Sequence, residues 1–128
     1  MNHVQRRQRG SATVETVIAV PVLIFLILVV IQAGLWFHGA HLVEAAAQEG
    51  VRAGRVDGGS SAVAEVRARQ FLTHLSPSLA GTAAITTSRN VDRTRVQVSG
   101  RVQPVIPGLD LTVTASAEAA TERFREDR

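Results

Sequence analysis

The sequence has no cysteine, no tyrosine and no lysine, and aromatic residues make up only 4% of its 128 positions. Without cysteine there is no disulfide framework and no thiol nucleophile. With so few aromatics, a hydrophobic core has to be built from valine, leucine, isoleucine and alanine. The Gly58-Gly59 pair has no lysine beside it, which argues against a phosphate-binding loop. These absences argue against thiol-dependent enzymes and against proteins with a lysine-containing phosphate-binding loop.

Charge is missing from one long stretch, because residues 16–37 contain no Asp, Glu, Lys or Arg. At about 1.5 Å per residue this stretch makes roughly 33 Å of helix, enough to cross a hydrocarbon core of about 30 Å. We therefore predict one transmembrane helix over residues 16–37. An ordinary secretory signal peptide fits less well, because its apolar region runs about 7–15 residues and ends in an A-x-A-like site. AGLWFHGAHL offers no such site.

The net charge of +3 comes from the N-terminal arm, since residues 1–10 carry three arginines while residues 11–128 carry 11 arginines and 11 acidic residues. The basic composition is therefore no sign of nucleic-acid binding. The positive-inside rule predicts a cytoplasmic N-terminus, with the C-terminal bulk outside the cytoplasmic membrane. Trp36 and Phe37 lie at the predicted outer end, where an aromatic belt is expected.

A single carboxylate, Glu15, stands where the apolar stretch begins, and Gly10 lies five residues before it. A charged side chain costs about 2.5–3.5 kcal/mol at the centre of a membrane helix and less near its end. On its own, Glu15 could simply reach the headgroups. The composite pattern of basic arm, glycine, four residues, glutamate and about twenty apolar residues, in RRQRGSATVETVIAVPVLIFLI, resembles the type IV pilin-like proteins.

That resemblance implies a leader that ends in glycine and is removed by a membrane-embedded prepilin peptidase. Mapped onto this sequence, cleavage falls between Gly10 and Ser11, and Glu15 becomes the fifth residue of the mature chain. Cleavage would create an ammonium group at Ser11 within the membrane interface. The Glu15 carboxylate of an adjacent subunit could then pair with it, so that two costly charges satisfy each other in low dielectric.

Within that superfamily the chain is most similar to the TadE-like pseudopilins of the tight adherence (Tad) pilus apparatus. The similar stretch is residues 9–54, in particular RGSATVE, the proline of AVPVLIFLI and AAAQEGVRAG. Ser11 replaces the phenylalanine that is typical of classical type IV pilins. The resemblance implies a minor pilin-like subunit without enzymatic activity or cofactor, in a hetero-oligomer that could reach the surface pilus. Its partners would be membrane lipid, the prepilin peptidase, other pilin-like subunits and the pilus assembly platform.

Two other functions stay open from the residues alone. In the first, the chain is an uncleaved single-pass scaffold or binding protein, and Gly10 and Glu15 are incidental. In the second, it is a small membrane-tethered enzyme, but no serine has recognisable His and Asp partners. His38, His41 and Glu44 share one helix face and are conceivable metal ligands, although a polar collar above the membrane explains them better. We predict no catalytic, metal or cofactor site.

The first helix is predicted to continue beyond the membrane, over residues 11–56, because LVEAAAQEGVRAGRV lacks proline and is rich in alanine. Pro21 removes one backbone hydrogen bond and is expected to kink this helix. Ala46, Gly50 and Gly54 form a stripe of small residues at i, i+4 and i+8. The stripe is suited equally to a contact with another subunit or to packing against the protein's own head.

The rest of the chain predicts a small head over residues 57–118. A short amphipathic helix is expected over residues 62–75, ended by Ser76 and Pro77. Its predicted apolar side consists of Val63, Val66, Phe71, Leu72 and Leu75.

Strand-like alternation follows at 83–88, 93–105 and 109–119, with Val96, Val98 and Val102 on one face and a possible bulge at Gly100. The expected fold is α+β, in which the long N-terminal helix extends into a head with one short helix and a roughly three-stranded antiparallel sheet. Residues 1–10 would be the basic leader and residues 119–128 a solvated, charged tail.

Overall fold

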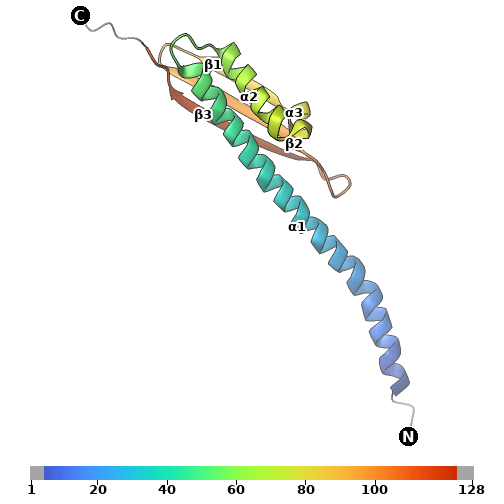
Figure 1. Ribbon diagram of the computed structural model, residues 1–128. Helices are drawn as coiled ribbons and strands as arrows, with labels where there is room; N and C mark the ends of the chain where they lie inside the picture. The colour runs from blue at the N-terminus through green and yellow to red at the C-terminus, as the bar shows by residue number, and fades with distance from the viewer. Residues whose placement is uncertain (1–4, 124–128) are drawn as a thin grey trace, which may run out of the picture.

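The computed structural model describes residues 5–123, and from residue 10 onward their side chains. One long helix, α1, is followed by two shorter helices and a three-stranded antiparallel sheet in the order β1-β2-β3 (Figure 1). The elements are α1 (Gln5–Arg55), α2 (Ser61–Leu75), α3 (Pro77–Thr82), β1 (Ala84–Arg89), β2 (Arg93–Val102) and β3 (Leu111–Ala120). The predicted α+β fold is confirmed.

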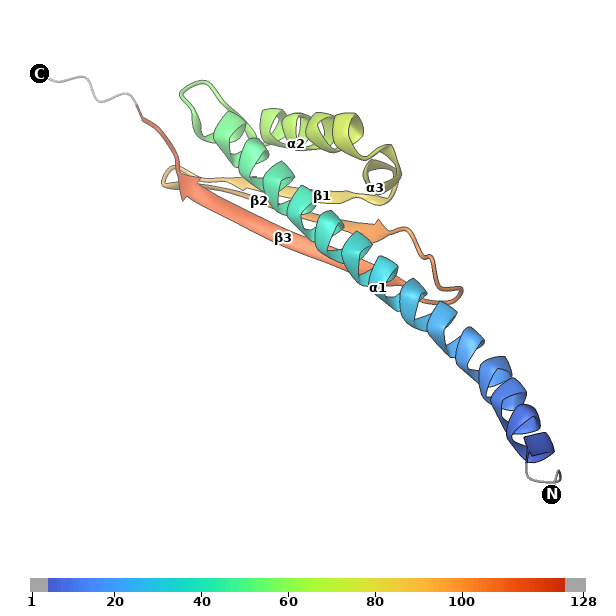
Figure 2. The same ribbon diagram turned by 60° about the horizontal axis from the view of Figure 1, so that its bottom comes forward.

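Helix α1 has two halves with different surroundings. Its C-terminal half lies across the sheet beside α2, whereas its N-terminal half stands clear of the head (Figures 1 and 2). The helix continues through Pro21 as one element. It ends at Arg55, where Arg52 and Arg55 in the last turn face the negative end of the helix dipole. Gly58, with a φ of 77°, makes the turn toward α2.

The core lies between the sheet and the two longer helices. Strand β2 alternates strictly, and its Val96, Val98 and Val102 are buried as predicted. The alternation follows from the pleat, because successive side chains point to opposite faces and only one face meets the helices. The buried apolar residues are Val43, Ala46, Ala47, Val51, Ala64, Ala68, Leu72, Leu79, Val96, Val98, Val102 and Val113.

The predicted buried side of α2 is wrong for most of its members. The buried residues of this helix are Ala64, Ala68 and Leu72, at i, i+4 and i+8. The side chains predicted to be buried but found 46–55% exposed are Val63, Val66 and Leu75. The predicted side was chosen by the hydrophobicity of its side chains. A helix that lies close to another helix instead places its smallest side chains at the contact.

The small-residue stripe of α1 supplies the other side of that contact. A Cβ atom at Gly50 would lie 2.9 Å from the carbonyl oxygen of Ala64, and one at Gly54 would lie 2.7 Å from the Cβ of Ala64. Ala46 is fully buried in the same interface. Of the two alternatives left open by the sequence, the structure thus has the stripe packed against the chain's own head.

We expect Gly54→Ala to destabilise the head. The added methyl group meets a fixed Cβ of Ala64, and overpacking of this kind costs about 1–3 kcal/mol. The better helix propensity of alanine returns at most about 1 kcal/mol. Thermal melts of the purified protein in detergent, followed by circular dichroism, should therefore show a lower Tm. Gly34→Ala is the matched control, because a Cβ there meets nothing within 4 Å. A Tm for Gly54→Ala equal to that of the control would contradict the close packing.

The predicted bulge at Gly100 is also wrong. Gly100 pairs with Val113 in an unbroken ladder between Ser99↔Thr114 and Arg101↔Thr112. The glycine instead makes room for α3, because a Cβ at this position would lie 2.7 Å from Cδ1 of Leu79.

Helix α3 itself was not predicted, since Pro77 was expected only to end the preceding helix. Proline is well suited to the first turn of a helix, where its missing N–H costs nothing, and here it begins one.

The expected solvated tail begins later than residue 119, because residues 119 and 120 belong to β3. Strand β3 continues to Ala120, after which the Thr121 amide donates to the carbonyl of Asp92 over 3.0 Å. The Glu122 amide donates to the carbonyl of Arg55 over 2.8 Å, so it satisfies one of the last carbonyl groups of α1. The remainder of the predicted tail, residues 124–128, lies outside the described residues.

Candidate functional site

The N-terminal half of α1 is an apolar surface that the head does not cover. We call residues 10–31 the exposed half of α1. Its large aliphatic and aromatic side chains from Val14 to Ile31 are 40–71% exposed, apart from Leu28, which is half-buried. Continuous apolar surface of this size is not left open to water in soluble proteins. By length and composition this helix can cross a membrane, and it is the one such helix among the described residues.

Gly10, Ser11 and Glu15 lie at the start of this exposed half. All three are exposed, and a Cβ at Gly10 would meet nothing within 4 Å. Ser11 and Glu15 are four residues apart, so they share one side of the helix at a separation of about 6 Å along its axis. Among the side chains of residues 10–123, none forms an ion pair or hydrogen bond with the Glu15 carboxylate. The carboxylate is thus available to a group from outside the chain.

The hydroxyl group of Thr16, which follows Glu15 in the sequence, is satisfied within the helix. Thr16 Oγ1 donates to the carbonyl oxygen of Ala12 over 2.9 Å. Threonine commonly bonds the carbonyl one turn back in this way, and the bond hides a polar group in an apolar setting. Thr16 thus adds little polarity beside Glu15, which leaves the carboxylate as the distinctive polar group at this end of the span.

A second polar residue, Gln32, was missed by the sequence analysis. It lies inside the predicted membrane span but is only 2% exposed. Its Oε1 accepts from the amides of Val105 (2.7 Å) and Ile106 (3.4 Å), and its Nε2 donates to the carbonyl of Gln103 over 3.4 Å. Gln32 therefore holds the β2–β3 loop, residues 103–110, against α1. The sequence did contain a signal for this role, because Gln32 carries a side-chain amide within the uncharged residues 16–37. Polar groups in such stretches usually have a partner.

Replacing Gln32 with leucine should release that loop. The amides of Val105 and Ile106 lose their acceptor, and an unsatisfied buried donor costs about 1–3 kcal/mol. Hydrogen–deuterium exchange of the peptide covering residues 103–110 should accelerate about tenfold or more, since 1.4 kcal/mol corresponds to a factor of ten. Gln48→Leu changes an exposed amide of the same helix and should leave this peptide unaffected. Unchanged exchange in both variants would show that Gln32 does not hold the loop.

The residues considered as metal ligands remain on the surface. His38, His41 and Glu44 are exposed, and Glu44 Oε1 accepts from Nε2 of Gln48 over 3.5 Å. Among the described residues, no three His, Cys, Asp or Glu side chains gather into a possible ion site. The structure thus gives no support to a metal centre at this position.

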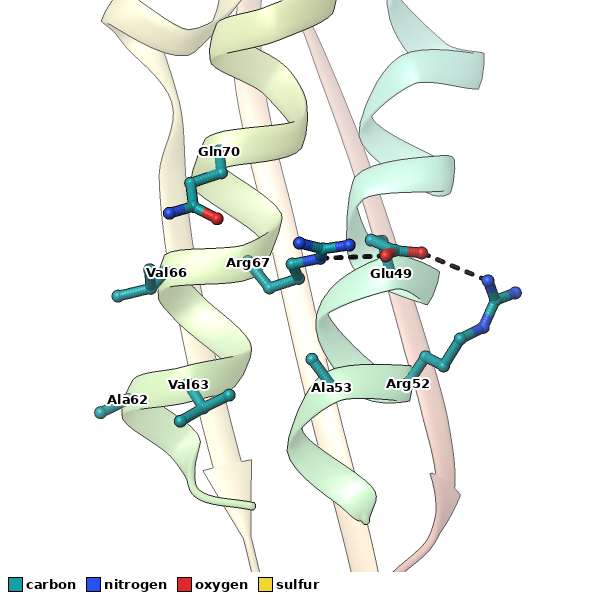
Figure 3. A pocket seen from close by; sticks show the side chains of 8 residues that line it. All are labelled: Glu49, Arg52, Ala53, Ala62, Val63, Val66, Arg67 and Gln70. Carbon is teal, nitrogen blue, oxygen red and sulfur yellow. Dashed lines mark hydrogen bonds and ion pairs between the residues drawn. The ribbon is translucent and has the colours of Figure 1, made fainter.

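A groove lies between α1 and α2 on the head (Figure 3). The Glu49 carboxylate lies at its centre and pairs with Arg52 (3.3 Å) and Arg67 (3.1 Å). The lining residues are Glu49, Arg52, Ala53, Ala62, Val63, Val66, Arg67 and Gln70. They include no serine, threonine, cysteine or histidine, so the groove offers no nucleophile paired with a base.

One exposed apolar helix that continues into the packing helix of a small α+β head fits a membrane-anchored, pilin-like protein. Comparison with protein families agrees with this class, because residues 10–52 match the family described as TadE-like protein. The predicted resemblance to the TadE-like pseudopilins is confirmed over these residues. The match begins at Gly10, includes Glu15 and ends within α1. No curated protein and no solved structure gives a significant match.

The TadE-like segment indicates involvement in assembly of the Tad pilus. The family is a structural component of the pilus and is not a known family of enzymes. Its partners are, in general terms, other pilus-related proteins. The head beyond residue 52 lies outside the match, so what the head does has to be argued from its structure.

Proposed function

We propose that the protein is a minor pilin-like subunit, a pseudopilin, that acts in assembly of a Tad-type pilus or secretion system. The observation that carries the proposal is the position of the family match. The TadE-like match covers Gly10, Glu15 and the exposed apolar side chains of α1 from Val14 to Ile31. In this proposal the helix crosses the cytoplasmic membrane, its N-terminus faces the cytoplasm and the head lies outside.

The leader is removed by a prepilin peptidase between Gly10 and Ser11. Both residues are helical in the unprocessed chain. A protease needs an extended substrate, so this turn of helix has to open before cleavage. Glycine lowers the cost of opening, because it is about 1 kcal/mol less favourable than alanine in a helix interior. Exposure of Gly10 and the lack of neighbours around it leave the peptidase unobstructed.

Glu15 then serves assembly. Cleavage places an ammonium group on Ser11, one turn from the subunit's own Glu15 and on the same side of the helix. When two such helices lie side by side, the carboxylate of one can reach the ammonium of the other. Each charge satisfies its counterpart at the membrane boundary, where an isolated charge is costly. The pairing directs how subunits join, and no chemical step is involved.

The uncleaved scaffold is the alternative, and one observation favours it: α1 passes unbroken through the Gly10–Ser11 bond to Gln5. In that case the basic arm would stay attached as a cytoplasmic anchor. Neither Gly10 nor Glu15 would then have a special role, so substitutions at both positions should have little effect. This expectation separates the two functions.

Deletion of the gene in the native host tests the proposed function directly. We expect loss of surface pili, measured by electron microscopy and by the amount of major pilin in the fraction sheared from cells. A plasmid copy of the wild-type gene should restore both. Normal piliation in the deletion strain would contradict a role in assembly and would favour the scaffold.

A further inference from the structure

The β2–β3 loop lies at the end of the sheet from which the exposed half of α1 emerges (Figures 1 and 2). Gln32 of α1 binds its backbone at three points, as described above. The β1–β2 turn, which contains Val91, lies at the opposite end of the sheet, near the end of α1 at Arg55. Of the two turns of the sheet, therefore, only the β2–β3 loop is close to the membrane span.

The composition of the loop suits an apolar environment. Residues 102–109 contain no charge, and the flanking charges Arg101 and Asp110 pair with each other over 3.6 Å. Val105 and Ile106 are half-buried and Leu109 is 37% exposed. An apolar groove runs between the loop and α1, lined by Val29, Gln32, Ala33, Trp36, Ile106, Leu109 and Leu111.

Several backbone N–H groups of the loop are absent or already bonded within the chain. Pro104 and Pro107 have no N–H group, and the Val105 and Ile106 amides donate to Gln32. The Leu109 amide donates to the carbonyl of Ile106 over 3.2 Å. Unsatisfied amides are the main cost of moving irregular backbone out of water. The loop therefore meets this cost within the chain for three of its six N–H groups, those of Val105, Ile106 and Leu109.

Distance along the helix gives the depth of the loop. Glu15 and Gln32 are seventeen residues apart, which is about 26 Å along the axis, slightly less than a hydrocarbon core of about 30 Å. If Glu15 marks the inner boundary, Gln32 and the loop bound to it lie at the outer one. Trp36, which is 36% exposed, lines the groove at the same level, as expected for an aromatic at a membrane interface.

We propose that the β2–β3 loop is a second membrane contact, in which Ile106, Pro107 and Leu109 enter the outer leaflet and lipid acyl chains cover the groove beside α1. This inference rests on the proposed insertion of α1 across the membrane. Two contacts with the bilayer, the span and the loop, hold α1 and the head packed on it at one tilt relative to the membrane. The head therefore presents one defined face to neighbouring subunits while the protein is in the membrane.

The absence of cysteine makes a direct test practical, because each introduced cysteine is the single labelling site. We would attach a nitroxide to Leu109→Cys, Pro107→Cys, Phe25→Cys and Val91→Cys, each in the full-length chain in bilayers of phosphatidylethanolamine and phosphatidylglycerol. Collision rates with oxygen, which concentrates in lipid, and with a water-soluble nickel complex report depth. Val91 is the matched control, since it is an apolar turn residue with 68% exposure at the far end of the sheet.

The oxygen-to-nickel ratio should be highest at Phe25 and several-fold higher at Leu109 and Pro107 than at Val91. Ratios at Leu109 and Pro107 equal to that at Val91, with Phe25 in lipid, would overturn the loop contact and leave the proposed function intact. A water-like ratio at Phe25 would instead refute insertion of α1, and the loop contact with it. Using two loop positions guards against a local disturbance by either label.

Discussion

Gly10→Leu is expected to abolish removal of the leader, so that the protein isolated from native membranes keeps all ten leader residues. In the proposed processing, the peptidase selects glycine and leaves no room for a branched side chain next to the scissile bond. A clash with the fold is not the competing explanation, because a Cβ at Gly10 meets nothing within 4 Å. Leucine also forms helices better than glycine by nearly 1 kcal/mol, which keeps this turn closed.

The control for this variant is Gly34→Leu, a glycine in the same helix whose surroundings are equally open. It should be processed like the wild type. Intact-mass measurement of both variants from membranes of the native host gives the answer without antibodies or activity assays. Complete processing of Gly10→Leu would show that cleavage does not depend on Gly10.

Glu15→Ala is expected to leave processing largely intact and to reduce pilus assembly to background. In the proposed assembly, alanine removes the carboxylate that would pair with the Ser11 ammonium of a neighbouring subunit. Loss of one partner from a buried ion pair costs about 3–5 kcal/mol, which is more than a hundredfold in association. Sheared-fraction assays and electron microscopy measure the output, and the mass of the variant verifies its processing.

Glu44→Ala is the matched control for the carboxylate. Glu44 is exposed on the same helix, but it lies beyond the apolar span, and its side chain accepts a hydrogen bond from Gln48. It should assemble normally. Normal pilus output from Glu15→Ala would refute the role assigned to this carboxylate, whatever the mass measurement shows.

Elements with a strong periodic pattern were predictable from the sequence. The long uncharged run, the alanine-rich continuation and the alternating valines of β2 each predict one structure, and each forms it. The errors share a different cause. At Gly100 and on α2, the deciding factor was how closely a distant segment approaches: Leu79 fills the space above Gly100, and Ala64 meets the glycines of α1. Hydrophobicity along one helix carries no information about such an approach.

The candidate site was only partly predictable, for a similar reason. Gly10 and Glu15 form a local pattern and could be found by spacing. Gln32 binds backbone groups more than seventy residues away in the sequence, which no local pattern reveals. The loop at residues 103–110 looked like an ordinary turn between strands. Its importance follows from where the fold brings it, beside the membrane span.

The N-terminal sequence and intact mass of the wild-type protein, isolated from membranes of its native host, test the central claim most directly. We expect a chain that begins at Ser11 and lacks the ten leader residues. A chain that begins at Met1 with the leader retained would contradict it, and the protein would then be an uncleaved membrane-anchored scaffold in which Glu15 is an ordinary residue at the membrane edge.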